Sequence, residues 1–151
     1  MIKLNLPDIA PKIKKEGLNN LIFDFIRKKY LVLTPEEWVR QHFVHYLVNQ
    51  LKYPKGLIQL EGGLKYNRLS KRSDIVVFDQ LGEAFLLTEC KAPSVKITSK
   101  VFEQAATYNY SLKAKFVVVT NGLQHFCCQL DYDQSQTVML DYIPPFSTGK
   151  S

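Results

Sequence analysis

The sequence predicts an α/β fold built on a central mixed β-sheet with helices on its faces. Residues 72–93, RSDIVVFDQLGEAFLLTECKAP, predict a hairpin because a glycine-containing turn joins two apolar runs. Both runs are apolar on both faces, which is typical of central strands that helices cover. A helical segment then leads to the apolar run KFVVVT at residues 115–120. Strand, helix and strand in this order predict a parallel pair, and hence a mixed sheet.

The composition is that of one globular domain over residues 1–151. Hydrophobic residues make up 46% of the chain, and no apolar run reaches the length of about 18 residues that a membrane span needs. The net charge of +6 is compatible with binding nucleic acid, although many basic proteins bind none. Cys90, Cys127 and Cys128 have neither a disulfide pattern nor zinc-site spacing, so we expect a reducing, cytoplasmic setting.

Weaker patterns stand at the two ends of the chain. Residues 1–33 form an N-terminal extension that we predict to be a β-hairpin around Gly17, with a helix over residues 19–29 as the alternative. At the other end the patterns predict an antiparallel hairpin formed by residues 124–131 and 137–140. A flexible tail is predicted to follow over residues 144–151.

A helix is predicted to begin at Pro35 and to end near residue 51 or 52, with Thr34 as its cap. Apolar residues at four-residue spacing predict its inward stripe: Val39, Phe43 and Leu47. Glu36 falls on that stripe, whereas Glu37 falls to the side and completes the cap. We therefore expect Glu36 to point inward, with a solvated first-turn glutamate as the alternative.

Charged residues stand at the open end of the hairpin over residues 72–93. With a turn over residues 80–83, the register places Asp74 opposite Glu89. Side chains alternate along a strand, so Lys91 shares a face with Glu89 while Cys90 points the other way. Two opposed carboxylates are unfavourable unless a cation bridges them, so the pattern predicts a divalent metal site with a lysine beside it. The alternative is two strand-end charges in solvent.

Beyond the hairpin, a helix is predicted over residues 100–113, with Thr98 or Ser99 as its cap. Gln104 and Tyr108 lie one turn apart on this helix and so share a face. Basic residues in the neighbouring loops are candidates for contacting phosphates, although solvation is their usual role: Lys65, Arg68, Lys71, Arg72, Lys96 and Lys100.

Asp74 followed by Glu89-Cys90-Lys91 resembles the signature of the PD-(D/E)XK nuclease superfamily, with Ser73 in place of the leading proline. A longer stretch, residues 29–130, resembles the N-terminal nuclease domain of type I restriction enzyme R subunits and their short stand-alone relatives. The matching segments are KKYLVLTPEEWVRQ, KRSDIVVFD, LLTECKAPSVKIT, FEQAATYN and FVVVTNG. The resemblance implies a restriction-endonuclease-like core.

The resemblance also implies a metal site and a reaction. Asp74, Glu89 and the carbonyl of Cys90 would hold Mg²⁺, for which Mn²⁺ can substitute, and Glu36 would complete the metal shell. The implied reaction is hydrolysis of a phosphodiester bond in DNA that leaves a 5′ phosphate.

Three further residues take roles from the same resemblance. Lys91 would orient or help deprotonate the attacking water, and Gln104 and Tyr108 would position the DNA backbone or other site residues. We therefore expect a Mg²⁺-dependent DNA endonuclease, either an excised domain or a stand-alone nuclease, with restriction motor, specificity or methylation subunits as further partners. The alternatives are a catalytically silent DNA-binding module of the same fold and a nuclease acting on RNA or branched DNA.

Overall fold

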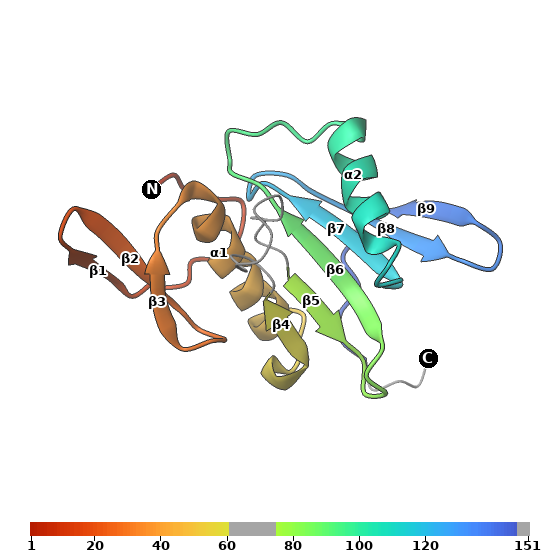
Figure 1. The fold of residues 1–151 in the computed structure, drawn as a ribbon, viewed down its shortest axis with the longest axis horizontal. Helices are drawn as coiled ribbons and strands as arrows, with labels where there is room; N and C mark the ends of the chain where they lie inside the picture. Colours follow the sequence, from red (N-terminus) through yellow and green to blue (C-terminus); the bar gives the residue numbers. More distant parts are fainter. Residues whose placement is uncertain (61–74, 148–151) are drawn as a thin grey trace.

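The computed structural model describes residues 1–60 and 75–147 of the chain. Over these residues the chain forms a three-stranded sheet, a six-stranded sheet and two α-helices (Figure 1). In chain order the elements are β1 (Ile13–Glu16), β2 (Asn19–Asp24), β3 (Lys29–Val32), α1 (Pro35–Asn49), the 3-10 turn η1 (Lys55–Leu57), β4 (Ile58–Leu60), β5 (Ile75–Phe78), β6 (Ala84–Cys90), α2 (Ser99–Asn109), β7 (Phe116–Thr120), β8 (His125–Asp131) and β9 (Gln136–Leu140). The predicted α/β class is confirmed.

The six-stranded sheet has the strand order β4-β5-β6-β7-β8-β9. Strands β6 and β7 pair in parallel, as the strand–helix–strand pattern predicts, and the other neighbours pair antiparallel. The sheet is therefore mixed. All of β7 is buried, as expected for a strand in the middle of a covered sheet. The predicted final hairpin forms as β8 and β9.

The two helices cover opposite faces of this sheet. Val118 packs in the main core with Phe43 of α1. Val117 and Val119 pack instead with Ala105 of α2. Since neighbouring residues of a strand point to opposite faces, α1 and α2 lie on opposite sides of β7. Neither helix in the described part of the chain is long and apolar enough to cross a membrane.

Helix α1 stands between the two sheets (Figure 1). Thr34 caps it as predicted, because its hydroxyl accepts a hydrogen bond at 3.0 Å from the backbone N–H of Glu37. The predicted inward stripe is wholly buried in the main core: Val39, Phe43 and Leu47. A second side of the helix is also buried, and there Gln41 accepts a hydrogen bond at 3.4 Å from the backbone N–H of Phe25.

The small sheet consists of β1, β2 and β3, all antiparallel. Strands β1 and β2 form the hairpin expected around Gly17, which has a φ of +64° in the turn. The alternative helix over residues 19–29 is wrong, because β2 and the turn after it occupy these residues. Strand β3 is a third strand that the sequence pattern did not predict.

Strands β5 and β6 form the predicted central hairpin. The predicted register is confirmed in three pairs: Ile75 with Thr88, Val76 with Leu87, and Val77 with Leu86. Nearer the turn it is wrong, because Phe78 pairs with Ala84 and leaves Phe85 as a bulge. The carboxylate of Asp79 accepts hydrogen bonds at 2.9 Å from the N–H groups of Leu81 and Glu83, which draws Asp79 into the turn.

Helix α2 begins as predicted and ends early. Thr98 caps it by accepting a hydrogen bond at 3.3 Å from the N–H of Val101. It ends at Asn109 instead of near Lys113. The Asn109 carboxamide accepts from the N–H of Ala114 at 2.9 Å and donates to its carbonyl at 3.2 Å, so this side chain turns the chain toward β7.

Both end segments are packed onto the six-stranded core. Leu4 is 5% exposed, and the N–H of Asn5 donates to the carbonyl of Gly122 at 2.8 Å. At the other end, the predicted flexible tail over residues 144–151 is wrong as far as Phe146. The Tyr53 hydroxyl donates to the Pro144 carbonyl at 2.6 Å, and the Phe146 ring packs on the Tyr53 ring at 5.8 Å between centroids. Burial of these rings holds the segment in place; the rest of the tail, residues 148–151, lies outside the described part.

Candidate active site

Glu89 and Lys91 form an ion pair where β6 ends. Lys91 Nζ lies 3.3 Å from Glu89 Oε2, so the two side chains share a face as predicted. The Glu89 side chain is 7% exposed and that of Lys91 is 27% exposed, so the pair opens toward solvent on the lysine side. The N–H of Lys91 donates to the carbonyl of Thr120 at 2.8 Å, which fixes the lysine backbone beside the end of β7.

Cys90 points to the other face, also as predicted. Its side chain is 1% exposed and belongs to the main core that α1 covers. Only its backbone carbonyl is therefore suited to the ligand role that the sequence assigned to it. Burial raises the pKa of the Cys127 thiol to about 12 and also raises that of Cys128, so both are unreactive thiols.

The carboxylate of Glu89 lies on the face of the sheet that α2 covers. Leu87 precedes it by two positions and packs with Tyr108 of α2. Val119 pairs with Glu89 across the parallel ladder and packs with Ala105 of the same helix. The middle of α2, near Ala105, therefore lies level with Glu89.

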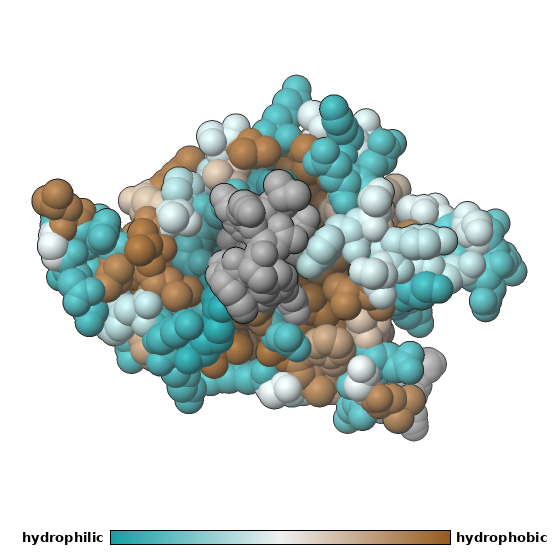
Figure 2. All heavy atoms as spheres, viewed as in Figure 1, coloured by the Kyte–Doolittle hydropathy of each residue, from teal (hydrophilic) through white to brown (hydrophobic). Residues whose placement is uncertain are grey.

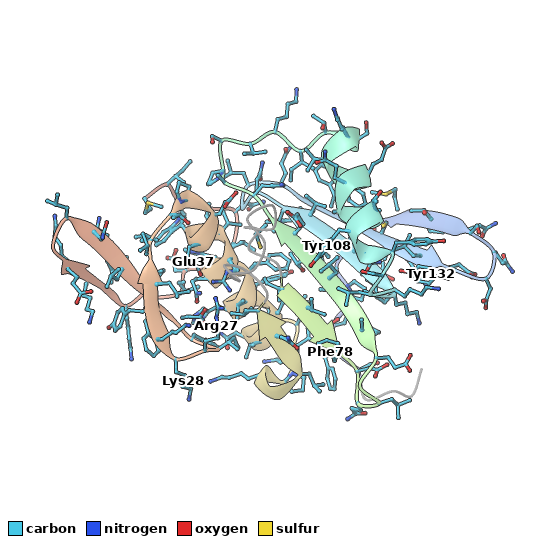
Figure 3. All side chains as sticks on the ribbon, viewed as in Figure 1. Arg27, Lys28, Glu37, Phe78, Tyr108 and Tyr132 are labelled. Carbon is cyan, nitrogen blue, oxygen red and sulfur yellow. The ribbon has the colours of Figure 1, made fainter. Side chains whose placement is uncertain are left out.

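Tyr108 and Gln104 take different positions on α2. Tyr108 is half-buried against the cluster of Val76 and Leu87, so it lies over β5 and β6 (Figure 3). Gln104 is exposed. It lies one turn before Tyr108 on the same flank of the helix, opposite the flank where Phe102 packs toward β8. The helix thus directs both residues toward β6, with Gln104 nearer the level of Glu89.

The orientation predicted for Glu36 and Glu37 is wrong. Glu37 is the buried residue, at 8% exposed, and its carboxylate accepts hydrogen bonds from Arg40 and, at 2.8 Å, from Gln41. Glu36 is partly exposed. The prediction assumed one covered side for α1, whereas the small sheet covers a second side and draws Glu37 into it. Glu37 is therefore committed to structure, and Glu36 is the first-turn carboxylate left near solvent.

A buried charged cluster at this junction was not predicted. Arg40 is 1% exposed, and its Nη2 lies 3.5 Å from Oδ2 of Asp24, which is wholly buried. Asp24 also accepts hydrogen bonds at 2.9 Å from the N–H groups of Ile26 and Arg27. Figure 3 shows Arg27 and Glu37 where the small sheet meets α1. Glu37 and Arg40 are three residues apart in one helix, and this spacing alone indicates that their side chains can pair.

Asp74, the proposed partner of Glu89, lies outside the described residues, as do Lys65, Arg68, Lys71 and Arg72. Within the described ranges, no group of three or more His, Cys, Asp or Glu side chains could by itself hold a metal ion. The placement of Asp74 opposite Glu89 thus stays a prediction. The pairing of β5 with β6 is described as far as Ile75 and Thr88, which is the pair next to the predicted pair of Asp74 and Glu89.

The loop after Lys91 is tied to the same edge of the sheet. Asn121, at the end of β7, donates a hydrogen bond to the carbonyl of Val95 at 2.9 Å. Its carboxamide oxygen accepts from the N–H groups of Leu123 and Gln124. Lys96 and Lys100 are exposed beside this loop. Asn121 was not predicted, since its role depends on a loop that is distant in sequence.

Comparison with known protein families gives a match over residues 35–144. The matched family is described as type I restriction enzyme R protein N terminus (HSDR_N). The chain belongs to this family. The resemblance to type I R subunits is therefore confirmed. No curated protein matches the chain. The R-protein match begins at α1 and includes α2, the six-stranded sheet and the Glu89–Lys91 pair, while β1, β2 and β3 lie outside it.

Proposed function

We propose that this R-protein N-terminal domain is a Mg²⁺-dependent DNA endonuclease of the PD-(D/E)XK type. The observation that carries the proposal is the Glu89–Lys91 pair at the carboxyl end of a central strand, where the Glu89 carboxylate is buried and Lys91 is partly exposed. A carboxylate seldom occupies such a position without a charge partner or a ligand, because burial of a charged group costs several kcal/mol. Family membership supports a role in restriction, with DNA and other restriction-system subunits as partners.

The donors available here suit Mg²⁺, a hard cation that prefers oxygen ligands. Glu89 supplies a buried carboxylate at the edge of the sheet, and the carbonyl of Cys90 stands next to it in the chain. Asp74 is the second proposed carboxylate. Glu36 stays the predicted outer ligand, although α1, to which it belongs, covers the opposite face of the sheet. The ion, when bound, would polarise the scissile phosphate and lower the pKa of a bound water.

The side chains of this domain have separable roles in the proposed hydrolysis. Lys91 is held beside Glu89 and would orient the attacking water and offset negative charge that develops on the phosphate. Gln104 and Tyr108 on α2 would hold the DNA backbone or the position of Lys91. The bond broken is the P–O3′ bond of the phosphodiester. The water oxygen becomes part of the 5′ phosphate, and the 3′ oxygen leaves and is protonated to a 3′ hydroxyl.

Cleavage of supercoiled plasmid by the purified protein tests the proposal. We expect nicking or linearisation with Mg²⁺ or Mn²⁺, none in EDTA, and loss in Asp74→Asn, Glu89→Gln and Lys91→Ala. Glu83→Gln is the matched control, since Glu83 is an exposed carboxylate in the turn of the same hairpin. Cleavage that persists unchanged in Glu89→Gln and Lys91→Ala would contradict the assignment.

Calorimetric titration with Mg²⁺ separates the reaction from the metal site. We expect binding by the wild type and by Glu83→Gln, and no binding by Glu89→Gln. Metal binding without any cleavage, on supercoiled, branched or single-stranded DNA or on RNA, would instead identify a DNA-binding accessory module of the same fold.

A further inference from the structure

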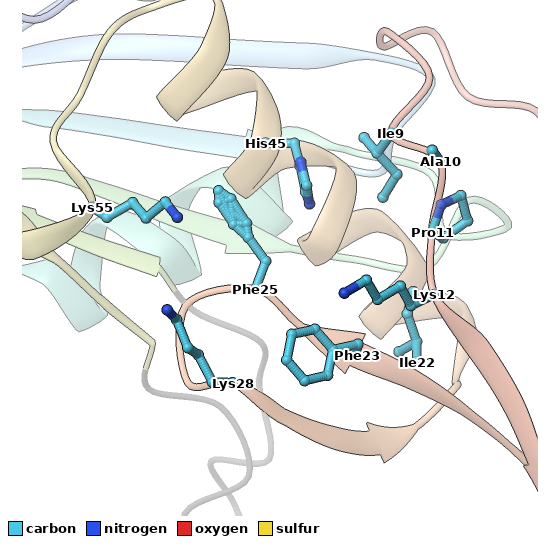
Figure 4. Close-up of a pocket in the computed structure, with 10 residues that line it drawn as sticks. All are labelled: Ile9, Ala10, Pro11, Lys12, Ile22, Phe23, Phe25, Lys28, His45 and Lys55. Carbon is cyan, nitrogen blue, oxygen red and sulfur yellow. The ribbon is translucent and has the colours of Figure 1, made fainter.

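A pocket of about 510 Å³ lies between the small sheet and the outer side of α1. The chain before β1, strand β2 and the turn after it form its walls, and α1 and η1 close it (Figure 4). The lining residues are Ile9, Ala10, Pro11, Lys12, Ile22, Phe23, Phe25, Lys28, His45 and Lys55. This pocket is distinct from the Glu89 site, which lies on the face of the six-stranded sheet away from α1.

The pocket is positively charged. Lys12, Lys28 and Lys55 come from three different segments and are all exposed, and Figure 4 shows their side chains around one opening. None of the described residues that line it is acidic. Asp24, at the end of β2, is buried and engaged with Arg27 and Arg40, so it does not neutralise these lysines. An anionic ligand fits this charge.

The walls between the lysines are aromatic. Phe23 and Phe25 are half-buried, and a lysine ammonium group lies over one face of each ring: Lys12 Nζ is 5.2 Å from the Phe23 centroid and Lys55 Nζ is 4.4 Å from the Phe25 centroid. The imidazole of His45 packs edge-on to Phe25 at 4.1 Å. Figure 2 shows hydrophobic and hydrophilic residues side by side over the small sheet. Aromatic faces flanked by cations bind a base together with its phosphate.

One of these lysines has an unfavourable backbone conformation. Lys28 has a φ of +56° and Ala10, on the opposite wall, has a φ of +49°. Residues other than glycine are disfavoured in this left-handed region, so glycine would be the ordinary residue at position 28.

We propose that this pocket binds a short segment of single-stranded DNA, with a base against Phe23 or Phe25 and phosphates at Lys12, Lys28 and Lys55. A single strand fits best because its bases are free to enter a pocket, whereas those of a duplex are paired and stacked. The choice of DNA rests on the proposed nuclease function. Binding itself needs neither Asp74 nor metal, because the pocket lies across α1 from the Glu89 site.

Fluorescence anisotropy with a labelled oligothymidylate of about ten nucleotides tests the proposal. The titrations use the full chain in EDTA, so that no cleavage occurs and failure of the nuclease proposal does not affect the result. The expected slope of log affinity against log salt is about −2, since three phosphate contacts contribute about −0.7 each on a single strand.

Lys28→Gly is the diagnostic variant, because it removes the ammonium group and relieves the backbone. Its melting temperature should be no lower than that of the wild type. Its affinity for the oligonucleotide should be about fivefold weaker at 0.1 M salt, and its slope of log affinity against log salt should be smaller in magnitude by about 0.7. Lys113→Gly is the matched control: Lys113 also has a φ of +56°, and it lies outside the pocket, in the turn between α2 and β7. Its binding should equal that of the wild type. Phe25→Leu, which keeps an apolar side chain, should weaken binding about tenfold or more.

Several outcomes would overturn the proposal. One is absence of binding by the wild type, and another is equal binding by Lys28→Gly and the wild type. Equal loss in Lys28→Gly and Lys113→Gly would mean that net charge alone attracts the strand. Full displacement of the strand by free thymidine monophosphate at low concentration would assign the pocket to free nucleotides, and tighter binding of oligouridylate would assign it to RNA.

Discussion

At the scale of single residues, the burial of Arg40 has the clearest energetic consequence. Its guanidinium lies between the carboxylates of Glu37 and Asp24, and all three residues are less than a tenth exposed. Arg40→Met keeps the length of the side chain but leaves two buried carboxylates without this cation. We expect a loss of about 3 kcal/mol in the free energy of unfolding, measured with urea.

Glu36→Gln is the control for that change, because Glu36 is partly exposed on the same turn of α1. It should alter the free energy of unfolding by no more than about 0.5 kcal/mol. A loss below about 1 kcal/mol in Arg40→Met would mean that water replaces the arginine in the cluster.

Gly122 is a second residue with a measurable role. It has a φ of +87°, and a Cβ there would lie 2.7 Å from Cδ2 of Leu4 and 3.1 Å from Cγ2 of Val39. We expect Gly122→Ala to lower the free energy of unfolding by about 2 kcal/mol or more, through backbone strain and displacement of Leu4. Gly82→Ala separates the two effects, since Gly82 has a φ of +84° with nothing within 4 Å of a Cβ. Equal losses in both variants would show that packing at Leu4 contributes nothing.

At the scale of elements, patterns within one element were predictive and contacts between distant elements were not. The stripe of α1 and the register of the central hairpin both follow from local periodicity. The burial of Glu37 depends on Asp24 and the small sheet, and no periodicity in α1 indicates that second partner. For the same reason the sequence predicted that Glu89 and Lys91, which are neighbours, share a face, but it did not predict the pocket lined by lysines of three segments.

The tail over residues 144–151 was predicted to be flexible, and as far as Phe146 this prediction is wrong. The hydrogen bond from the Tyr53 hydroxyl to the Pro144 carbonyl joins the loop before η1 to this segment. Tyr53→Phe leaves that buried carbonyl without its donor and should cost about 1 kcal/mol of unfolding free energy in urea. Tyr142→Phe is the control, because Tyr142 is 56% exposed and should give no change. Limited proteolysis should also cut the Tyr53→Phe protein faster near its C-terminus.

At the scale of the whole molecule, three buried or half-buried histidines couple stability to pH. Burial lowers the pKa of His42, His45 and His125 below the ordinary value of 6.5, and for His45 repulsion by His42 and Lys55 adds to the effect. The unfolded chain therefore binds more protons than the folded one just below pH 6.5, so stability falls as pH decreases through that value. The urea midpoint should be lower at about pH 5.5 than at about pH 7.5, a range in which carboxylates stay ionised.

Replacement of all three histidines by glutamine should flatten that dependence between the two pH values. A midpoint that is equal at both values in the wild type would contradict the burial argument. A pH dependence that survives in the triple variant would assign the titration to other groups.

The position of α1 between two sheets also bears on where the protein can be cut for expression. The residues matched to the R-protein family begin at position 35, so a fragment bounded by that match would lack β1, β2, β3 and Leu4. Arg40 would lose Asp24, and the space beside Gly122 that Leu4 fills would open to water. The residues matched to the family thus leave out contacts that α1 makes in the full chain, and we expect the shorter fragment to unfold at a lower urea concentration than the full chain.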